Sequence, residues 1–181
     1  GQIIPWNFPV FLMAFKLPAA LLAGNSIVIK PAPTTPLTTL RFGELIANVL
    51  PAGLVNILAD KNDLGDKITT HKGISKISFT GSTATGARVM ASAASTLKRV
   101  TLELGGNDAG IVMDDVDVEA VAPQIFDGAF GNNGQICIAM KRVYAHESIY
   151  DKLVDQLAAL AEQAAVGNGL EQGTKLGPLQ N

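Results

Sequence analysis

The sequence contains only one cysteine, Cys137, few charged residues (17%) and no long uninterrupted apolar run. A single cysteine excludes an intrachain disulfide, and no group of Cys and His residues has metal-ligand spacing, so no metal site is predicted. The formal net charge of −2 gives no indication of nucleic acid or an anionic membrane as a partner. The longest apolar stretch, residues 8–23, is interrupted by Pro9, Lys16 and Pro18 and is too short to span a bilayer. These features fit a protein of a reducing compartment, and we expect a cytoplasmic location.

Hydrophobic residues make up 48% of the 181 positions, which is enough for a large core and excludes a disordered chain. The length suits one domain or one and a half. The chain opens inside an apparent strand and closes on residues 175–181, which resemble a loop in the middle of a fold. We therefore expect a fragment of a longer protein.

Short apolar strands alternate with helical segments over the first half of the chain. Five strands separated by four helices favour an α/β fold with a doubly wound, parallel sheet, because right-handed crossovers connect parallel strands. A turn with glycines at 80–86 leads into the last of these helices. The expected strands are 2–5, 26–30, 54–58, 75–79 and 99–103, and the expected helices are 10–23, 37–50, 62–71 and a helix that ends near 94.

Beyond Gly106 the pattern loosens, and we place a domain boundary near Asn107. Residues 1–106 then form a cofactor-binding domain, and residues 107–181 form part of a second α/β domain that carries catalytic groups. The elements expected in the second part are a strand at 110–113, a helix at 118–130, a strand at 140–146 and a helix at 148–165.

Two expectations concern how the early helices pack. Helix 10–23 is so apolar that we expect it to be mostly buried, with Lys16 extending its charge to the surface. Helix 37–50 is amphipathic, and its apolar face is predicted from residues near helical spacing. Those residues are Leu37, Leu40, Leu45 and Val49.

Polar groups follow four of the expected strands: Asn7, Lys30, Gly81 with Ser82, and Glu103. Ligands of open parallel sheets bind at the carboxyl ends of the strands, so these groups are candidates for one site. Each of these groups also has an interpretation in which it takes no part in ligand binding. The amide can shape a turn, the lysine can be solvated, the glycine turn can be a plain strand–helix connection, and the carboxylate can lie on the surface. If Glu103 is partly desolvated instead, a raised pKa would suit a general base.

Cys137 follows a loop rich in glycine and amides at residues 131–135. Backbone N–H groups of loops and helix N-termini stabilise thiolates, so this position favours a covalent nucleophile. The alternative is a buried cysteine that acts as a small hydrophobe.

Taken together, six segments resemble the signature segments of the NAD(P)-dependent aldehyde dehydrogenase superfamily, in order and spacing. The resemblance covers the whole chain, and the joint match is highly specific. The segments are 5–9 (PWNFP), 30–32 (KPA), 79–82 (FTGS), 102–106 (LELGG), 134–137 (GQIC) and 176–179 (LGPL).

The resemblance implies that a small-molecule aldehyde is oxidised to a carboxylic acid with NAD or NADP. It makes Cys137 the nucleophile that carries a thiohemiacetal and then a thioester, Glu103 the general base, Asn7 an oxyanion donor and Lys16 a member of a proton relay. It also implies a homodimer or homotetramer. The residues that it assigns to the cofactor site are Ile3, Ile4, Pro5, Trp6, Lys30, Gly65, Phe79, Gly81, Ser82 and Leu104.

The sequence departs from the family pattern at three places. Many NAD-preferring members carry Glu three residues after the ribose-binding lysine, where this chain has Pro33, which removes a barrier to NADP. A glycine that is common near Asp60 is absent, and Asn107-Asp108 replaces a more usual Lys-Ser. Other functions remain open: a CoA-acylating or acyl-phosphate-forming dehydrogenase, a catalytically incomplete nucleotide-binding fragment, or a non-catalytic binding or structural protein of this fold.

Overall fold

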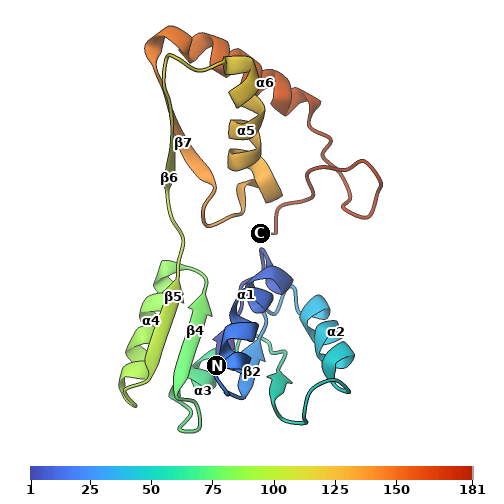
Figure 1. Ribbon diagram of the computed structural model, residues 1–181, viewed down its shortest axis with the longest axis vertical. Helices are drawn as coiled ribbons and strands as arrows, with labels where there is room; N and C mark the ends of the chain where they lie inside the picture. The colour runs from blue at the N-terminus through green and yellow to red at the C-terminus, as the bar shows by residue number, and fades with distance from the viewer. Residues whose placement is uncertain (181) are drawn as a thin grey trace. The chain divides into compact units, whose positions relative to one another are not determined.

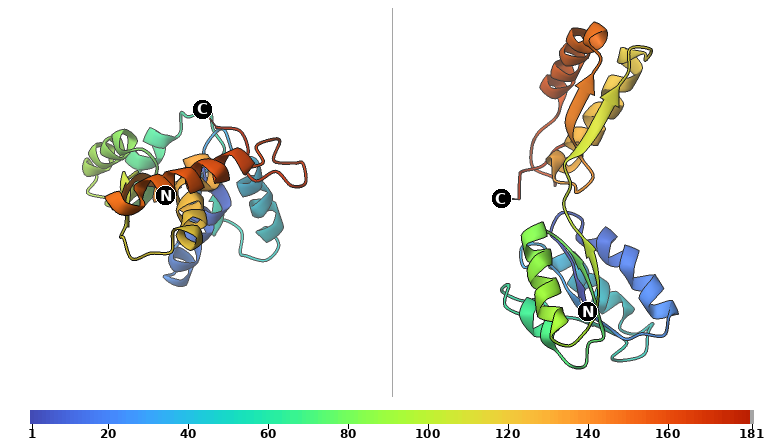
Figure 2. Two further views of the ribbon diagram at one scale, coloured as in Figure 1. Left: turned by 90° about the horizontal axis from the view of Figure 1, so that it is seen from above. Right: turned by 90° about the vertical axis from the view of Figure 1, so that its left-hand side faces the viewer.

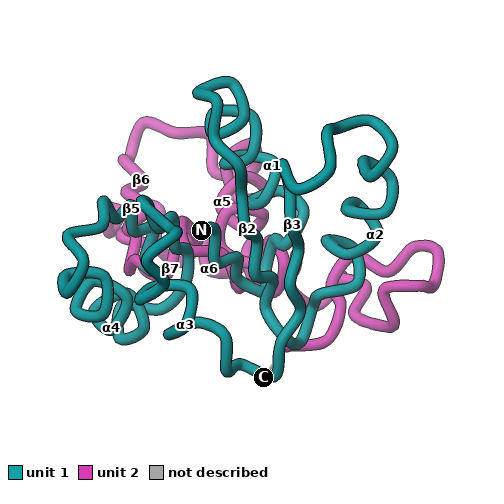
Figure 3. Tube along the Cα trace, turned by 90° about the horizontal axis from the view of Figure 1, so that it is seen from below, with its two compact units in different colours: residues 1–105 teal, residues 106–181 magenta. Residues whose placement is uncertain are grey.

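The computed structural model describes residues 1–180, which form two compact units. The first unit is Gly1–Gly105 and the second is Gly106–Asn181 (Figures 1 and 3). In the sequence, the boundary between the units falls between Gly105 and Gly106, shortly after the fifth strand ends at Glu103.

The first unit is built on a five-stranded sheet in which every pairing is parallel. The strand order is β3-β2-β1-β4-β5, so the chain winds outward from the central strand first to one side and then to the other. This order confirms the doubly wound α/β fold. The strands are β1 (Gln2–Ile3), β2 (Ile27–Lys30), β3 (Val55–Ile57), β4 (Lys76–Thr80) and β5 (Arg99–Glu103).

Helices cover both faces of this sheet (Figure 2). Two apolar clusters show the division, since residues of α1 and α2 pack in one and residues of α3 and α4 in the other. Successive residues of β1 point to opposite faces: Ile3 lies in the cluster of α3 and α4, and Ile4, just after the strand, lies in the other. The helices are α1 (Pro9–Leu22), α2 (Leu37–Ile46), α3 (Gly65–Thr70) and α4 (Thr83–Ala94).

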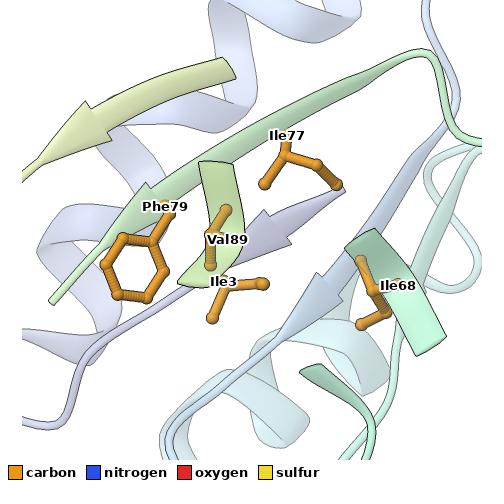
Figure 4. Close-up of a cluster of buried hydrophobic side chains, with 5 residues drawn as sticks. All are labelled: Ile3, Ile68, Ile77, Phe79 and Val89. Carbon is orange, nitrogen blue, oxygen red and sulfur yellow. The ribbon is translucent and has the colours of Figure 1, made fainter. Parts of the chain in front are cut away.

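The cluster beneath α3 and α4 joins four elements through side chains that are nearly all inaccessible to solvent (Figure 4). Ile3 and the pair Ile77 and Phe79 come from neighbouring strands, while Ile68 and Val89 come from the two helices. Burial of such side chains stabilises the fold by about 1.5–3 kcal/mol each. The cluster therefore holds β1 and β4 against α3 and α4.

Helix α1 differs from expectation, because only one face of it is buried. Met13 and Leu17 are buried against the sheet, whereas Phe11 and Phe15 stack on each other at the surface, with ring centroids 6.3 Å apart. Phe15 is 71% exposed. The prediction of a mostly buried helix was wrong, because overall hydrophobicity does not say how much of a helix its sheet can cover.

The apolar face predicted for α2 was also wrong. Leu37 is 76% exposed, and Leu45 and Val49 are exposed too. The helix instead turns Thr39, which is fully buried, toward the interior, and a Cβ added at Gly43 would lie 2.9 Å from Ile57. The helix thus faces the sheet with the small residues Thr39 and Gly43 and with Phe42, which packs in the same apolar cluster as Met13 and Leu17.

The second unit contains two parallel strands joined by a helical crossover, β6 (Asp108–Val112), α5 (Val118–Phe130) and β7 (Met140–Ala145). Strand β6 starts two residues earlier than predicted. The final helix, α6 (Tyr150–Gln163), is preceded by a short 3-10 turn and packs with α5 over the strands, around Leu153.

None of the described helices is both long enough and apolar enough to cross a bilayer. Within residues 1–180, no cluster of three His, Cys, Asp or Glu side chains is arranged to hold a metal ion.

Candidate active site

The central strands of the first sheet end in register. Ile3 pairs with Lys30 on one side and with Phe79 on the other, and Thr80 pairs with Glu103. The strand order reverses between β1 and β4, and ligands of doubly wound sheets bind outside the carboxyl ends of the strands at such a switch point. The loops that start there hold most of the predicted cofactor residues.

The turn from β4 into α4 and the first turns of the helix pack closely against two apolar side chains. A Cβ added at Gly81 would lie 2.6 Å from the ring of Phe79, and one added at Gly86 would lie 2.6 Å from Leu104. Ser82 caps the helix, since its Oγ accepts the backbone N–H of Thr85 at 3.2 Å. The remaining N–H groups of the first turn are available to an anion.

A buried polar atom points to the same turn as a binding site. The hydroxyl of Thr80 is inaccessible and has no hydrogen-bond partner among the described residues. A phosphate group of a dinucleotide at the amino end of α4 fits this combination of open backbone, glycine and free N–H groups. These residues therefore fit NAD or NADP.

The remaining residues predicted to line the cofactor surround the end of β1. Ile4 is buried and its N–H donates to the carbonyl of Lys30 at 2.9 Å. Pro5 and Trp6 follow as partly exposed loop residues, and the carbonyl of Trp6 accepts the hydroxyl of Thr35 at 3.4 Å. Gly65 opens α3, also beyond the carboxyl end of a strand. Asn7 lies in the loop that follows β1, two residues before α1 begins.

The alternative interpretation of Lys30 as a lysine in solvent is wrong. Its side chain is 4% exposed, and its Nζ donates to Asp60 Oδ1 at 2.9 Å and to the carbonyl of Pro31 at 3.1 Å. Burial works to raise the pKa of the Asp60 carboxyl, but hydrogen bonds from Lys30 and from backbone N–H groups outweigh it and hold the pKa below its usual value. The sequence did not identify Asp60 as a site residue. The absence of a glycine that is common near this position in the family was the only signal for it.

The prediction that Lys16 extends its charge to solvent was wrong. Its Nζ is buried and has no hydrogen-bond partner among the described residues. Burial lowers the pKa of Lys16 from 10.5 to about 8, although the negative charge of Glu103 acts in the opposite direction. An amine that titrates near pH 8 can pass protons at physiological pH, which an ordinary lysine cannot.

This buried amine predicts how stability depends on pH. Folded Lys16 loses its proton near pH 8, while the unfolded chain keeps it to about pH 10.5, so stability should rise with pH across that window. Lys16→Met should raise the free energy of unfolding at pH 7 by about 1 kcal/mol, allowing for solvent screening, and flatten the rise. Urea unfolding of the full-length protein at pH 7 to 10.5 measures both. Lys67→Met, at an exposed lysine of α3, serves as the control, and an unchanged slope in Lys16→Met would contradict the prediction.

Glu103 ends β5 with its side chain exposed. The carboxylate is therefore not partly desolvated, and the surface position that the sequence left open is the one found. The exposed position leaves the carboxylate open to water and to substrate, which a base that activates water requires.

Cys137 lies in a turn between a 3-10 segment, Gly131–Gly134, and β7, and not at a helix N-terminus. The residue is exposed, so the alternative of a buried hydrophobe is wrong. Asn132 and Asn133 both adopt left-handed backbone angles, with φ of 49° and 59°. Asn133 also donates to the carbonyl of Gly177 at 2.6 Å, which ties the loop to a distant segment of the same unit.

Lys141 holds the turn around Cys137 from the other side. Its Nζ donates to the carbonyls of Ile136, Cys137 and Ala139 at 3.0, 3.3 and 3.2 Å. The sequence pattern predicts only that this lysine lies near the start of a strand, 140–146. Its spacing of four residues from the cysteine does not predict contacts with three carbonyls, because these depend on the path of the turn.

Comparison with known proteins places the chain among enzymes of one kind. A family model described as the aldehyde dehydrogenase family matches residues 1–181. The mitochondrial aldehyde dehydrogenase of Leishmania tarentolae is 48% identical over 182 residues, and phenylacetaldehyde dehydrogenase of Pseudomonas fluorescens is 43% identical over 181. In both cases the alignment covers 99% of this chain but only 36% of the relative.

Solved structures agree with the sequence relatives. A crystal structure of betaine aldehyde dehydrogenase from Staphylococcus aureus in complex with NAD+ superposes with a TM-score of 0.94 at 37% identity. The match covers 99% of this chain and 36% of that structure. The chain therefore spans about a third of the length of the proteins that it matches.

Proposed function

Because the chain belongs to the aldehyde dehydrogenase family, we propose that its protein oxidises a small-molecule aldehyde to a carboxylic acid with NAD or NADP through Cys137. The observation that carries the proposal is the exposed cysteine, held in a turn by Lys141, in a chain that the family model matches from end to end. A cysteine sulfur that solvent can reach is one that an aldehyde can reach.

The chemistry starts with attack of the Cys137 sulfur on the aldehyde carbonyl. The attack gives a tetrahedral thiohemiacetal with negative charge on oxygen. We assign stabilisation of that charge to the Asn7 side-chain amide and the backbone N–H of Cys137. A single donor of this type contributes about 3 kcal/mol to the transition state.

The second half of the proposed reaction releases the product. When bound, the nicotinamide cofactor supplies the hydride acceptor, and an acyl group is left on the Cys137 sulfur as a thioester. Glu103 then takes a proton from water, the resulting hydroxide attacks the thioester, and the acid departs. Lys16, with its lowered pKa, is proposed to pass protons away from this region.

The test is product analysis with the full-length protein. We expect aldehyde and NAD or NADP to give the free carboxylic acid in the absence of any other acceptor. A product that forms only with coenzyme A or phosphate would indicate an acylating dehydrogenase instead. Absence of turnover over a panel of aldehydes, with cofactor binding intact, would indicate a nucleotide-binding protein and contradict the proposal. The predicted cytoplasmic location and the dimeric or tetrameric state remain predictions.

A further inference from the structure

The backbone around Cys137 forms a β-turn over residues 136–139. The N–H of Ala139 donates to the carbonyl of Ile136 at 3.2 Å, which leaves Cys137 and Ile138 in the two central positions of the turn. Ala139 is buried, whereas Cys137 and Ile138 are both exposed. The end of the turn is therefore anchored, and its two central residues face solvent.

Lys141, the second residue of β7, directs its ammonium group into this turn. Its Nζ lies within 3.3 Å of three carbonyl oxygens, those of Ile136, Cys137 and Ala139. An ammonium group has three N–H donors and no acceptor, so these three bonds use all of its donors. Lys141 therefore acts on the backbone of the turn and has no donor left for a bound anion.

The ammonium group holds the peptide groups on both sides of the Cys137 Cα. One of them joins the carbonyl of Ile136 to the N–H of Cys137, and the other carries the carbonyl of Cys137. In a trans peptide group the N–H points away from the carbonyl, and the described residues contain no cis peptide bond. The N–H of Cys137 thus faces away from Lys141, and it donates to no acceptor within residues 1–180.

The turn by itself does not fix both of these peptide groups. The carbonyl of Ile136 also accepts the N–H of Ala139, but among the described residues only Lys141 donates to the carbonyl of Cys137. That carbonyl belongs to the central peptide group of the turn, whose orientation reverses between the two common types of β-turn. Without the ammonium group, the backbone at Cys137 can therefore exchange between two conformations.

We propose that Lys141 is a positioning residue that keeps the backbone N–H of Cys137 directed at the substrate oxygen. The inference rests on the proposed function, which assigns this N–H to the negative oxygen of the thiohemiacetal. Lys141 itself touches neither substrate nor cofactor in this role. It acts through the two peptide groups that it holds, so its effect is confined to reactions that place negative charge on that oxygen.

The experiment compares two reactions of the same sulfur in the full-length protein. Aldehyde oxidation passes through an oxyanion, and its rate is measured as kcat/KM for the aldehyde at saturating cofactor. Alkylation by iodoacetamide forms a bond between the Cys137 sulfur and the CH₂ carbon, breaks the carbon–iodine bond, releases iodide and creates no oxyanion. Its rate constant is measured at alkaline pH, where it no longer rises with pH, by mass spectrometry of the peptide that contains Cys137.

Lys141→Met keeps most of the apolar stem and removes the donors. The ratio of the oxidation rate to the alkylation rate should fall at least about tenfold, because one oxyanion donor contributes about 10²–10³-fold to kcat and only part of that is lost. Lys175→Met is the matched control. Lys175 is an exposed lysine of the same unit whose side chain makes no hydrogen bond within the described residues, and the ratio should stay within about twofold.

Lys141→Arg keeps a cation in the turn and covers the case in which Lys141→Met does not fold. A planar guanidinium cannot aim N–H groups at three carbonyls that converge on one point, so the ratio should fall by about threefold or more. An unchanged ratio in either folded variant, including an equal loss of both rates, would mean that Lys141 only holds the sulfur in place, and would overturn the inference. If the unmodified protein is alkylated at Cys137 but oxidises no aldehyde, the proposed function itself fails.

Discussion

Replacing Cys137 with alanine should abolish aldehyde oxidation while cofactor binding stays within about twofold of the unmodified protein. Loss of a covalent nucleophile costs an enzyme on the order of 10⁴-fold or more in kcat, because no other group can carry the acyl intermediate. The folded state should be little affected, since the side chain is exposed. The measurement is the rate of aldehyde-dependent cofactor reduction, together with calorimetric titration of the cofactor.

Cys137→Ser provides the companion variant for this test. A hydroxyl is close in size to a thiol but a far weaker nucleophile, so the serine variant should be nearly as inactive as the alanine variant. Thermal unfolding of both variants within a few degrees of the unmodified protein would show that the turn is intact. Turnover above about 1% in Cys137→Ala would rule out Cys137 as the nucleophile.

The second large effect is expected for Glu103→Gln, and it should appear only in the second half of the reaction. Glutamine keeps the size of the exposed side chain but cannot accept a proton from water. Rapid mixing with aldehyde and cofactor should therefore produce one equivalent of reduced cofactor per active site in a fast burst. The steady rate that follows should be slower by about 10²–10⁴-fold.

Glu147→Gln tests whether any exposed glutamate has this effect. Glu147 begins the short 3-10 turn before α6 and is exposed, like Glu103, but it does not lie at the end of a strand of the first sheet. We expect this variant to match the unmodified protein in both its burst and its steady rate. A Glu103→Gln enzyme with an unchanged steady rate would show that another group activates water. Loss of the burst itself would place the carboxylate in the first half of the reaction.

Much of the fold could be predicted because it depends on local patterns. Five short apolar strands, the first four of which are each followed by a helical segment, indicate parallel strands with crossovers, and the structure has that order. The residues near Gly24 predicted the end of the first helix, and Gly24 adopts a left-handed φ of 77° there. Short-range steric preferences of this kind operate wherever the segment lies in the fold.

The predictions that failed concern burial. Leu37 and Leu45 are exposed although they have helical spacing, and Lys16 and Lys30 are buried although they carry charge. Whether a side chain is covered depends on which distant segment packs over it. No window of neighbouring residues contains that information.

The sequence by itself determined the family, the doubly wound order of elements and the candidate chemistry of Cys137, Glu103 and Asn7, because motifs and periodicity are properties of the chain. The tertiary structure alone decided that Lys30 is paired with Asp60 and that Lys16 has a buried amine. The physical reason is that charges thirty residues apart interact only after the sheet has brought the ends of its strands together, and the cost of burying a charge is set by that assembled environment.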